Sequence, residues 1–425
     1  MDLMSAKQWK RLDVVRRIQQ GVLTVVVAAK VLGLSSRQMS RLVRRVEKGG
    51  EKSLAHGNTG RSPAHRIEPE TRKRVVELMR GKYAGFNDQH FTEKLAEHEG
   101  LNLSKSTVRR ILRESDIMAV RKRRGRQHRR RRERRAQAGL MILWDGSRHE
   151  WLEGRGPMMC LMGAIDDATG ELLPGAHFLE HESAAAYLRV LLAIVREKGV
   201  PLSAYMDQHG ALKRNDASWT LEEELNGERR PTQVGLALKA LEIECIFALS
   251  PQAKGRVERL WGTLQDRLTS ELRLVGAKTI DQANVVLERH RAEHNRRFAV
   301  LARDSNPAWR ALHGVDVERV CSFHYEAVVG NDNTVRIGKN IIDIPPGRSR
   351  RSYAKVRVEV RQTLDGRWRI YSGDDLIASA PSTTLTSEMR VLARRRGANE
   401  VQKRKPDLRD RRDRRRGPTG TRANG

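Results

Sequence analysis

A run of arginines between residues 121 and 135 constrains the architecture more than any other stretch of the chain. Eleven of its fifteen residues are Arg or Lys, and only one is acidic. A segment with this charge repels itself and cannot form part of a packed core. The residues before it and after it must therefore fold as separate domains. Residues 121–138 are predicted to be a linker that a polyanion neutralises, and Arg123, Arg124 and Arg130 suit contacts with phosphate groups.

The charge of the whole chain points in the same direction. Its 425 residues carry a formal net charge of +30, with a sequence pI of about 10.8. Nucleic acid is the leading partner that this charge predicts, and a membrane surface is the alternative. No apolar run approaches the ~18 residues of a spanning helix, and the first residues show no signal-peptide pattern. The three cysteines lie far apart and form no CxxC pair, which fits a reducing cytoplasm.

Residues 1–50 have the pattern of a helix-turn-helix domain. Thr24 opens a short helix, Gly33 suits a tight turn, and a second helix is expected over residues 36–48. That second helix is basic on its exposed side, where the residues predicted to contact DNA are Arg37, Arg41, Arg44 and Arg45. In this arrangement the second helix can enter a major groove. An ordinary helical hairpin with a solvated face is the alternative.

Two further segments before the arginine run are candidates for DNA contact. Residues 51–69 form a linker in which Arg61 belongs either to a basic arm in a minor groove or to a plain connector. Residues 70–120 are predicted to form a second domain of the winged-helix or helix-turn-helix type. Ser104 caps its third helix, which turns Arg109 and Arg110 outward. Two such domains in tandem would read a longer site than one.

After the linker, apolar strands alternate with helices. Apolar runs predict strands over residues 140–144, 158–165, 171–178, 202–206 and 243–247. Residues 139–300 should therefore form an α/β layer fold, in which three strands meander and the others cross over helices. Residues 318–380 contain short β-branched runs separated by turn sequences, which predicts a small β-barrel. Residues 394–425 lack apolar periodicity and are predicted to be a disordered basic tail.

Three acidic residues accompany the predicted strands of the α/β domain. Asp145 ends the first strand, Asp207 ends the fourth, and Glu258 lies on the helix after the last strand. Sites of open α/β sheets form at this edge, and three converging carboxylates need a cation in order to ionise together. Carboxylate oxygens suit Mg²⁺ or Mn²⁺, and two such ions can clamp a phosphodiester displacement. Taken alone, Glu258 is more often half of a solvated ion pair.

Other polar residues near these acids have less specific interpretations. Lys254 and Arg256 are predicted to hold DNA phosphates, with simple balancing of the nearby carboxylate as the alternative. Asp166 and Asp167 belong to a turn sequence and are expected to be structural. His209 is the histidine best placed to be a ligand, although single histidines are more often structural.

Three blocks of sequence resemble the catalytic blocks of bacterial insertion-sequence transposases, with the ISNCY type of the retroviral-integrase-like DDE superfamily as the nearest group. These blocks are Asp145-Gly146-Ser147 with Trp151–Pro157, then Met206–Gly210, then Pro251–Arg259. The resemblance covers nearly the whole chain. It implies tandem helix-turn-helix domains, an RNase H-like core whose catalytic and metal-binding triad is Asp145, Asp207 and Glu258, and a small C-terminal β-domain. It also implies a bacterial, nucleoid-associated enzyme that cuts and joins double-stranded DNA as a homo-oligomer.

Two other functions stay open at this point. A non-enzymatic, sequence-specific DNA-binding regulator derived from a transposase would use only residues 1–118. The intact triad argues against a regulator, because a descendant without catalytic activity should tolerate the loss of any one of the three acids. An enzyme such as a glycosidase would use two of the acids, but the basic charge and the helix-turn-helix domains argue against it. Strong DNA binding without metal-dependent cleavage would favour the regulator, and failure to bind DNA at low salt would favour the glycosidase.

Overall fold

A computed structural model of the chain describes residues 5–55, 66–120, 132–213, 221–227, 229–248 and 255–385. The chain divides into two compact units, Met1–Glu77 and Leu78–Gly425. Several parts of the chain with a predicted role lie outside the described residues: Arg61, Arg123, Arg124, Arg130, Lys254 and the tail 394–425. Within the described part, no helix is long and apolar enough to cross a membrane.

The first unit contains the predicted helix, turn and helix. Its elements are α1 (Ala6–Gln19), α2 (Val25–Leu32), α3 (Ser36–Gly49) and the short 3₁₀ helix η1 (Glu51–Leu54). The side chains of Thr24 and Ser35 accept hydrogen bonds from backbone N–H groups in the first turns of α2 and α3, which fixes where these helices begin. Gly33 has a left-handed backbone with a φ of 64°, which permits the tight turn between them.

A second set of three helices follows, as predicted. These are α4 (Pro69–Arg80), α5 (Asp88–His98) and α6 (Lys105–Glu114). The side chains of Asn87 and Ser104 accept hydrogen bonds from the first turns of α5 and α6. The apolar residues of α6 are buried, which leaves Arg109 and Arg110 on the outer face, whereas Arg113 is half-buried and pairs with Asp88.

The α/β domain is built on a five-stranded sheet with the order β3-β2-β1-β4-β5. Its strands are β1 (Ile142–His149), β2 (Met159–Asp166), β3 (His177–Leu179), β4 (Ser203–Met206) and β5 (Glu244–Phe247). The first three form an antiparallel meander, while β1, β4 and β5 are parallel. The strand predicted over residues 171–178 is much shorter. Pro174 has no N–H to donate, and Gly175 turns the chain with a φ of 79°.

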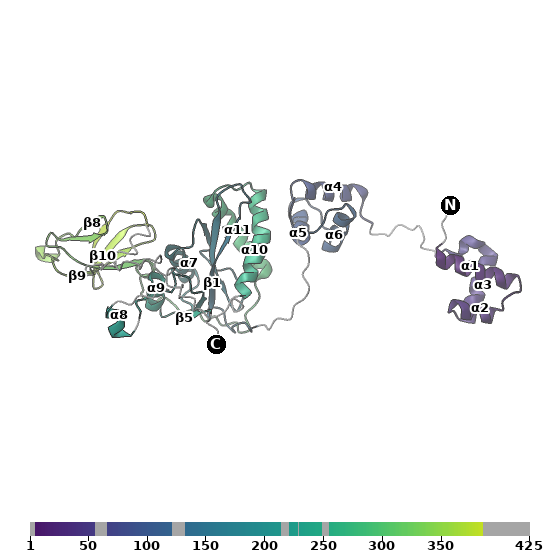
Figure 1. Ribbon diagram of the computed structural model, residues 1–425, viewed down its shortest axis with the longest axis horizontal. Helices are drawn as coiled ribbons and strands as arrows, with labels where there is room; N and C mark the ends of the chain where they lie inside the picture. The colour runs from purple at the N-terminus through teal and green to yellow at the C-terminus, as the bar shows by residue number, and fades with distance from the viewer. Residues whose placement is uncertain are drawn as a thin grey trace, which may run out of the picture. The chain divides into compact units, whose positions relative to one another are not determined.

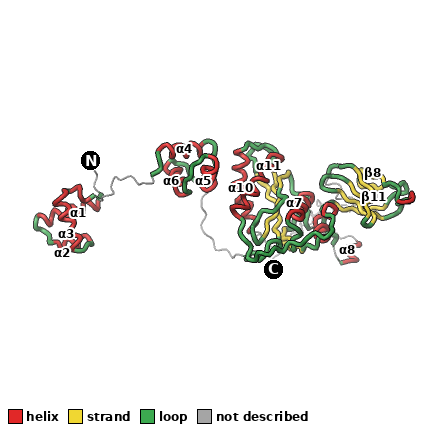
Figure 2. The backbone as a smooth tube through the Cα atoms, turned by 180° about the vertical axis from the view of Figure 1, so that it is seen from behind, coloured by secondary structure: helices red, strands yellow, loops and turns green. Residues whose placement is uncertain are grey.

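Helices cover both faces of this sheet (Figure 1). One face carries α7 (Ala184–Glu197) and α9 (Gln233–Ala240), and the other carries α10 (Gly255–Leu274) and α11 (Ile280–Phe298). The short helix α8 (Leu221–Asn226) precedes α9. Figure 2 shows the same strands between the same helices from behind. The predicted α/β layer fold is confirmed.

Strand alternation separates the two cores of this domain. Trp144 of β1 belongs to the core under α7, whereas Leu143 belongs to the core under α10. Successive residues of a strand point to opposite faces, so each strand supplies both cores. This alternation also decides toward which helix a polar residue at the sheet edge points.

The C-terminal domain contains two separate sheets, so the β-barrel predicted for residues 318–380 is not confirmed. One sheet has the order β11-β10-β9-β6, and the other is the hairpin β7-β8. The elements are α12 (Val317–Val320), β6 (Phe323–Val328), β7 (Thr334–Ile337), β8 (Asn340–Asp343), η3 (Arg348–Arg350), β9 (Arg357–Gln362), β10 (Trp368–Ser372) and β11 (Asp375–Ala380). Pro345 and Pro346 follow β8 and have no N–H for further pairing.

Candidate active site

Two of the three predicted acids lie on adjacent parallel strands. Asp207 directly follows β4, as predicted. Asp145 lies inside β1 and not at its end, because the antiparallel pairing with β2 extends the strand to His149. The parallel register pairs Leu143 with Tyr205, and each aspartate lies two residues beyond this last pair of the two strands. Both aspartates are half-buried.

Helix α10 covers this pair of aspartates. Leu143, two residues before Asp145 in β1, belongs to the core under α10, so alternation turns Asp145 toward the same helix. The indole Nε1 of Trp261 in α10 donates a hydrogen bond of 3.1 Å to Asp145 Oδ2. This bond joins the helix to the first aspartate.

Glu258 lies in the first turn of α10, three residues before Trp261, and is exposed. Residues 249–254, directly before this helix, lie outside the described residues. Among the residues that the structure does describe, no three Asp, Glu, His or Cys side chains form a group that could hold a metal ion. The two aspartates therefore lie on or directly after adjacent strands, and Glu258 lies on the helix that is bonded to Asp145, but the three do not surround one point.

One arginine predicted to contact DNA is bound to a buried carboxylate. Arg256 and Arg132 both pair with Oδ1 of Asp167. Asp167 has no exposed surface, and its other oxygen accepts a hydrogen bond of 2.8 Å from the backbone N–H of Arg135. Arg256 thus balances a carboxylate, but that carboxylate belongs to Asp167 and not to Glu258. The end of the arginine run is in this way attached to the core beside the first turn of α10.

The turn that follows β2 is structural, as predicted. The carboxylate of Asp166 accepts hydrogen bonds from the backbone N–H groups of Gly139 at 2.7 Å and Thr169 at 2.8 Å. Burial raises the pKa of Asp166, although these hydrogen bonds oppose the shift. The carboxylate connects the segment before β1 to the end of β2.

Glu182 also lies near the aspartates, although no sequence motif predicted it. Glu182 lies between β3 and α7; its Oε1 accepts a hydrogen bond from the Tyr187 hydroxyl and lies 3.4 Å from His209 Nδ1. Burial raises the pKa of Cys160 to about 11, and the charges of Glu182 and Asp145 add to the shift, so both acids lie near this thiol. The strand topology could have pointed to Glu182. β3 and β1 are both antiparallel to β2, so β3 is parallel to β1 and β4, and an acid after β3 lies at the edge where β4 ends.

The basic side chains predicted on two helices are exposed. Those on α3 are Arg37, Arg41, Arg44 and Arg45, and those on α6 are Arg109 and Arg110. Each set lies on the face opposite the buried apolar residues of its helix. An outward basic helix is the element that a helix-turn-helix domain inserts into a groove of DNA.

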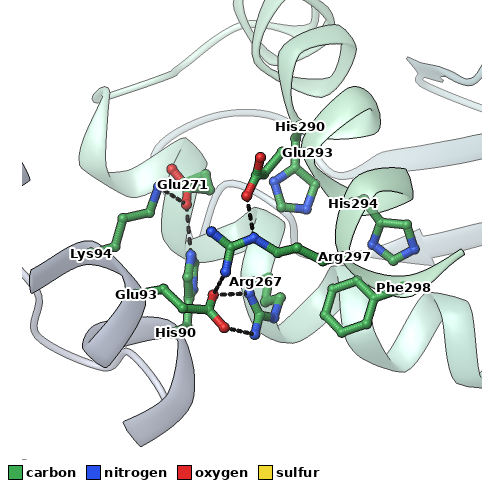
Figure 3. A pocket seen from close by; sticks show the side chains of 10 residues that line it. All are labelled: His90, Glu93, Lys94, Arg267, Glu271, His290, Glu293, His294, Arg297 and Phe298. Atoms are coloured by element: carbon green, nitrogen blue, oxygen red, sulfur yellow. Dashed lines mark hydrogen bonds and ion pairs between the residues drawn. The ribbon is translucent and has the colours of Figure 1, made fainter. Parts of the chain in front are cut away.

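A polar pocket lies where α5 meets α10 and α11 (Figure 3). Arg267 of α10 lies 2.6 Å from Glu93 of α5, and His90 Nε2 of α5 lies 2.7 Å from Glu271 of α10. Burial lowers the pKa of His290 in α11 to about 3, so this histidine is neutral near pH 7. The described charged side chains that line the pocket pair with one another, so the pocket serves to fix α5 against α10 and α11.

Comparisons with known proteins bear on this arrangement. Residues 11–73 match the family of winged helix-turn-helix domains. The transposase y4bF of Sinorhizobium fredii is 38% identical over 310 residues, which are 73% of this chain and 66% of that protein. The chain thus spans slightly less than two thirds of this relative. The transposase for insertion sequence IS1202 of Streptococcus pneumoniae is 30% identical over 402 residues, which are 84% of this chain and 82% of that protein.

Among solved structures, the catalytic core domain of the HTLV-2 integrase in complex with magnesium is similar at a low level. It is 17% identical, and the match covers 36% of this chain and 87% of that chain with a TM-score of 0.25. A TM-score this low does not establish a common fold. The two transposases are matched over most of the chain, and they carry the comparison.

Proposed function

Because this chain belongs to the transposases of bacterial insertion sequences, we propose that it is a metal-dependent polynucleotidyl transferase of the DDE type. Its helix-turn-helix domains bind the terminal inverted repeats of its own element. It cuts the 3′ ends of the element and joins the freed 3′ hydroxyl groups to target DNA. Double-stranded DNA is the substrate of both steps, and several copies of the chain act together on it.

The pairing of β1 with β4 supports this proposal most directly. Asp145 and Asp207 each follow the Leu143–Tyr205 pair by two residues, toward the sheet edge where open α/β folds form their sites. The hydrogen bond from Trp261 attaches α10 to Asp145, and the same helix carries Glu258. The exposed arginines of α3 and α6 supply the positive charge that holding DNA requires.

The chemistry of these side chains fits a divalent cation. Carboxylate oxygens are the ligands that Mg²⁺ and Mn²⁺ prefer, and both aspartates are half-buried, so each keeps surface that a cation can reach. We assign Asp145 and Asp207 as ligands from the sheet and Glu258 as the ligand from α10. Two bound ions would supply Lewis-acid stabilisation of charge on the phosphodiester. The chain itself orients its ligands. The indole of Trp261 donates a hydrogen bond to Asp145, and the backbone N–H of His209 donates one of 3.1 Å to Asp207 Oδ1.

The test uses duplex DNA that carries the inverted repeats flanking the gene. We expect wild-type protein to cut and join this DNA only when Mg²⁺ or Mn²⁺ is added. Asp207→Asn should lose more than about 100-fold of this activity and keep its affinity for DNA. Asp281→Asn is the control, because Asp281 is an exposed acid at the start of α11. Full activity in Asp207→Asn would refute the assignment, and tight binding without cleavage under either metal would favour a DNA-binding regulator.

A further inference from the structure

We propose that Glu182 is a positioning residue of the active site, which holds the segment after β4 through His209 and so orients Asp207. This inference rests on the proposed function, because it takes Asp207 to be a metal ligand. In this role Glu182 acts through neighbouring protein atoms and touches neither DNA nor metal.

Glu182 lies at the same edge of the sheet as Asp207. β3 and β4 are both parallel to β1, so their carboxyl ends share one edge, and Glu182 comes three residues after the end of β3. Its Oε1 atom accepts a hydrogen bond from the Tyr187 hydroxyl of α7 and lies 3.4 Å from His209 Nδ1. One carboxylate oxygen therefore joins the first turn of α7 to the segment after β4.

Tyr187 restrains Glu182 from the side of the core. Its side chain is fully buried, and its ring meets Trp144 of β1 edge-on with the centroids 5.1 Å apart. Burial raises the pKa of Tyr187, and the charge of Glu182 raises it further, so the hydroxyl keeps its proton and remains a donor. Because the buried Tyr187 hydroxyl is held in place, its hydrogen bond restrains the orientation of the Glu182 carboxylate.

Gly146, directly after Asp145, shows how closely Glu182 approaches β1. A Cβ atom at Gly146 would lie 2.7 Å from Glu182 Oε2 and 2.9 Å from Met162 Sδ. The φ of Gly146 is not positive, so space and not backbone conformation calls for glycine here. The carboxylate of Glu182 thus fills the volume that a side chain beside Asp145 would need.

His209 passes the restraint from Glu182 to Asp207. The backbone N–H of His209 donates a hydrogen bond of 3.1 Å to Asp207 Oδ1. The ring Nδ1 of the same residue accepts a hydrogen bond of 3.3 Å from the backbone N–H of Ala211 and lies 3.4 Å from Glu182 Oε1. The imidazole is therefore bound to its own turn through Ala211, and its Nδ1 edge lies against Glu182. Loss of such a support for a ligand typically costs roughly 10- to 100-fold in metal affinity or activity.

The central experiment compares two substitutions in one loop. Glu182→Gln keeps the shape of the side chain and removes its charge, and Glu180→Gln is the matched control because Glu180 is exposed two residues earlier. We expect Glu182→Gln to weaken Mn²⁺ binding to the full chain roughly 10-fold in a calorimetric titration, and to slow strand transfer by a similar factor. DNA affinity and the unfolding temperature should equal those of wild type. Glu180→Gln should match wild type in every measurement.

Two further variants test the route of the effect. Gly146→Ala displaces the carboxylate of Glu182 without removing it, and it should also weaken Mn²⁺ binding. His209→Gln breaks the link to Asp207, so adding Glu182→Gln to it should cause little further loss. Losses of Mn²⁺ affinity that multiply in the double variant would overturn the route through His209.

The outcomes also separate this inference from the proposed function. Equal Mn²⁺ affinity and activity in Glu182→Gln and Glu180→Gln, with Asp207→Asn inactive, would overturn the role of Glu182 alone. Unchanged Mn²⁺ affinity in Asp207→Asn would overturn both proposals. A wild-type protein that binds Mn²⁺ through Asp207 and cleaves no DNA would refute the proposed reaction, and Mn²⁺ affinity would still decide the role of Glu182.

Discussion

Asp145 and Asp167 both lie close to α10, yet their surroundings differ. Asp167 is fully buried and shares one oxygen between Arg132 and Arg256. Asp145 is half-buried and accepts a hydrogen bond from an uncharged indole. A buried carboxylate that two arginines neutralise is committed to holding the protein together, whereas one at the sheet edge can take a cation. The partners of Asp167 thus show a structural role, while metal ligation by Asp145 stays a prediction.

We therefore expect Asp167→Asn to destabilise the core without touching the reaction centre. The substitution leaves Arg256 without its buried carboxylate, which should lower the free energy of unfolding by about 3 kcal/mol. Urea unfolding followed by tryptophan fluorescence measures this change. Asp365→Asn is the control, because Asp365 pairs with Arg367 on an exposed turn, where such pairs contribute less than about 1 kcal/mol. Equal stability of the two variants would contradict the expectation.

Among the elements, α10 connects the candidate active site to α5. Its 20 residues span about 30 Å. The first turn carries Glu258, and the last turns hold α5 through the ion pair of Arg267 with Glu93 and the hydrogen-bond contact of Glu271 with His90. Burial alone would raise the pKa of Glu271, but hydrogen bonds from His90 and Lys94 outweigh it and hold the pKa at about 2. This contact combines paired charges with buried neutral histidines.

The contact should weaken in acid. Burial lowers the pKa of His290 from 6.5 to about 3, against the pull of Glu271. Its other charged or titratable neighbours are His294, His90 and Arg267. The folded state binds a proton on His290 less readily than the unfolded chain does. The contribution of neutral His290 to the free energy of unfolding is therefore complete above about pH 6.5. It is lost as the pH falls toward 3, by at most about 1.4 kcal/mol per pH unit.

Two histidine variants test this pH dependence. His290→Gln should reduce the fall in the free energy of unfolding between pH 6.5 and 4.5 without removing it, because His294, whose pKa burial lowers to about 4, still titrates. His98→Gln should leave it unchanged, since His98 is exposed at the end of α5. Urea unfolding at a series of pH values measures both slopes. The same slope in both variants would show that His290 does not carry the effect.

For the whole molecule, the dominant property is a net charge of +30. The exposed arginines of α3 belong to one unit and those of α6 to the other. Each phosphate contact that such a side chain makes releases counterions, so binding to DNA should fall steeply as salt rises. Because the two helices lie in different units, their contributions should add.

Paired substitutions measure these contributions. Arg41→Ala with Arg44→Ala should reduce the slope of log K against log salt for duplex DNA by about 2, and Arg109→Ala with Arg110→Ala by a similar amount. Arg16→Ala with Arg17→Ala is the control, because these arginines lie in the last turn of α1 and pair with Glu51 and Asp13. Fluorescence anisotropy over a range of salt concentrations measures the slopes. An equal drop in the control would mean that net charge alone matters.

Local chemistry made much of the fold predictable from the sequence. Thr24 and Ser104 begin helices because a side-chain oxygen accepts a hydrogen bond from the backbone N–H groups that a helix start leaves free. Apolar runs predicted the order of strands and helices, because burial on both faces of a sheet requires continuous apolar sequence. The acids Asp145, Asp207 and Glu258 were singled out by their place relative to these runs and by resemblance, and their catalytic assignment stays a prediction.

Other features depend on contacts between residues that are far apart in the chain. The bond between Trp261 and Asp145 joins residues 116 positions apart, and the Arg256–Asp167 pair joins residues 89 apart. Whether the C-terminal strands close into a barrel depends likewise on pairing between strands. The sequence by itself determined the elements, their order and their charge, because these follow from neighbouring residues. Only the tertiary structure decided that Glu182 lies beside the segment after Asp207, because the packing of α7 against the sheet sets that distance.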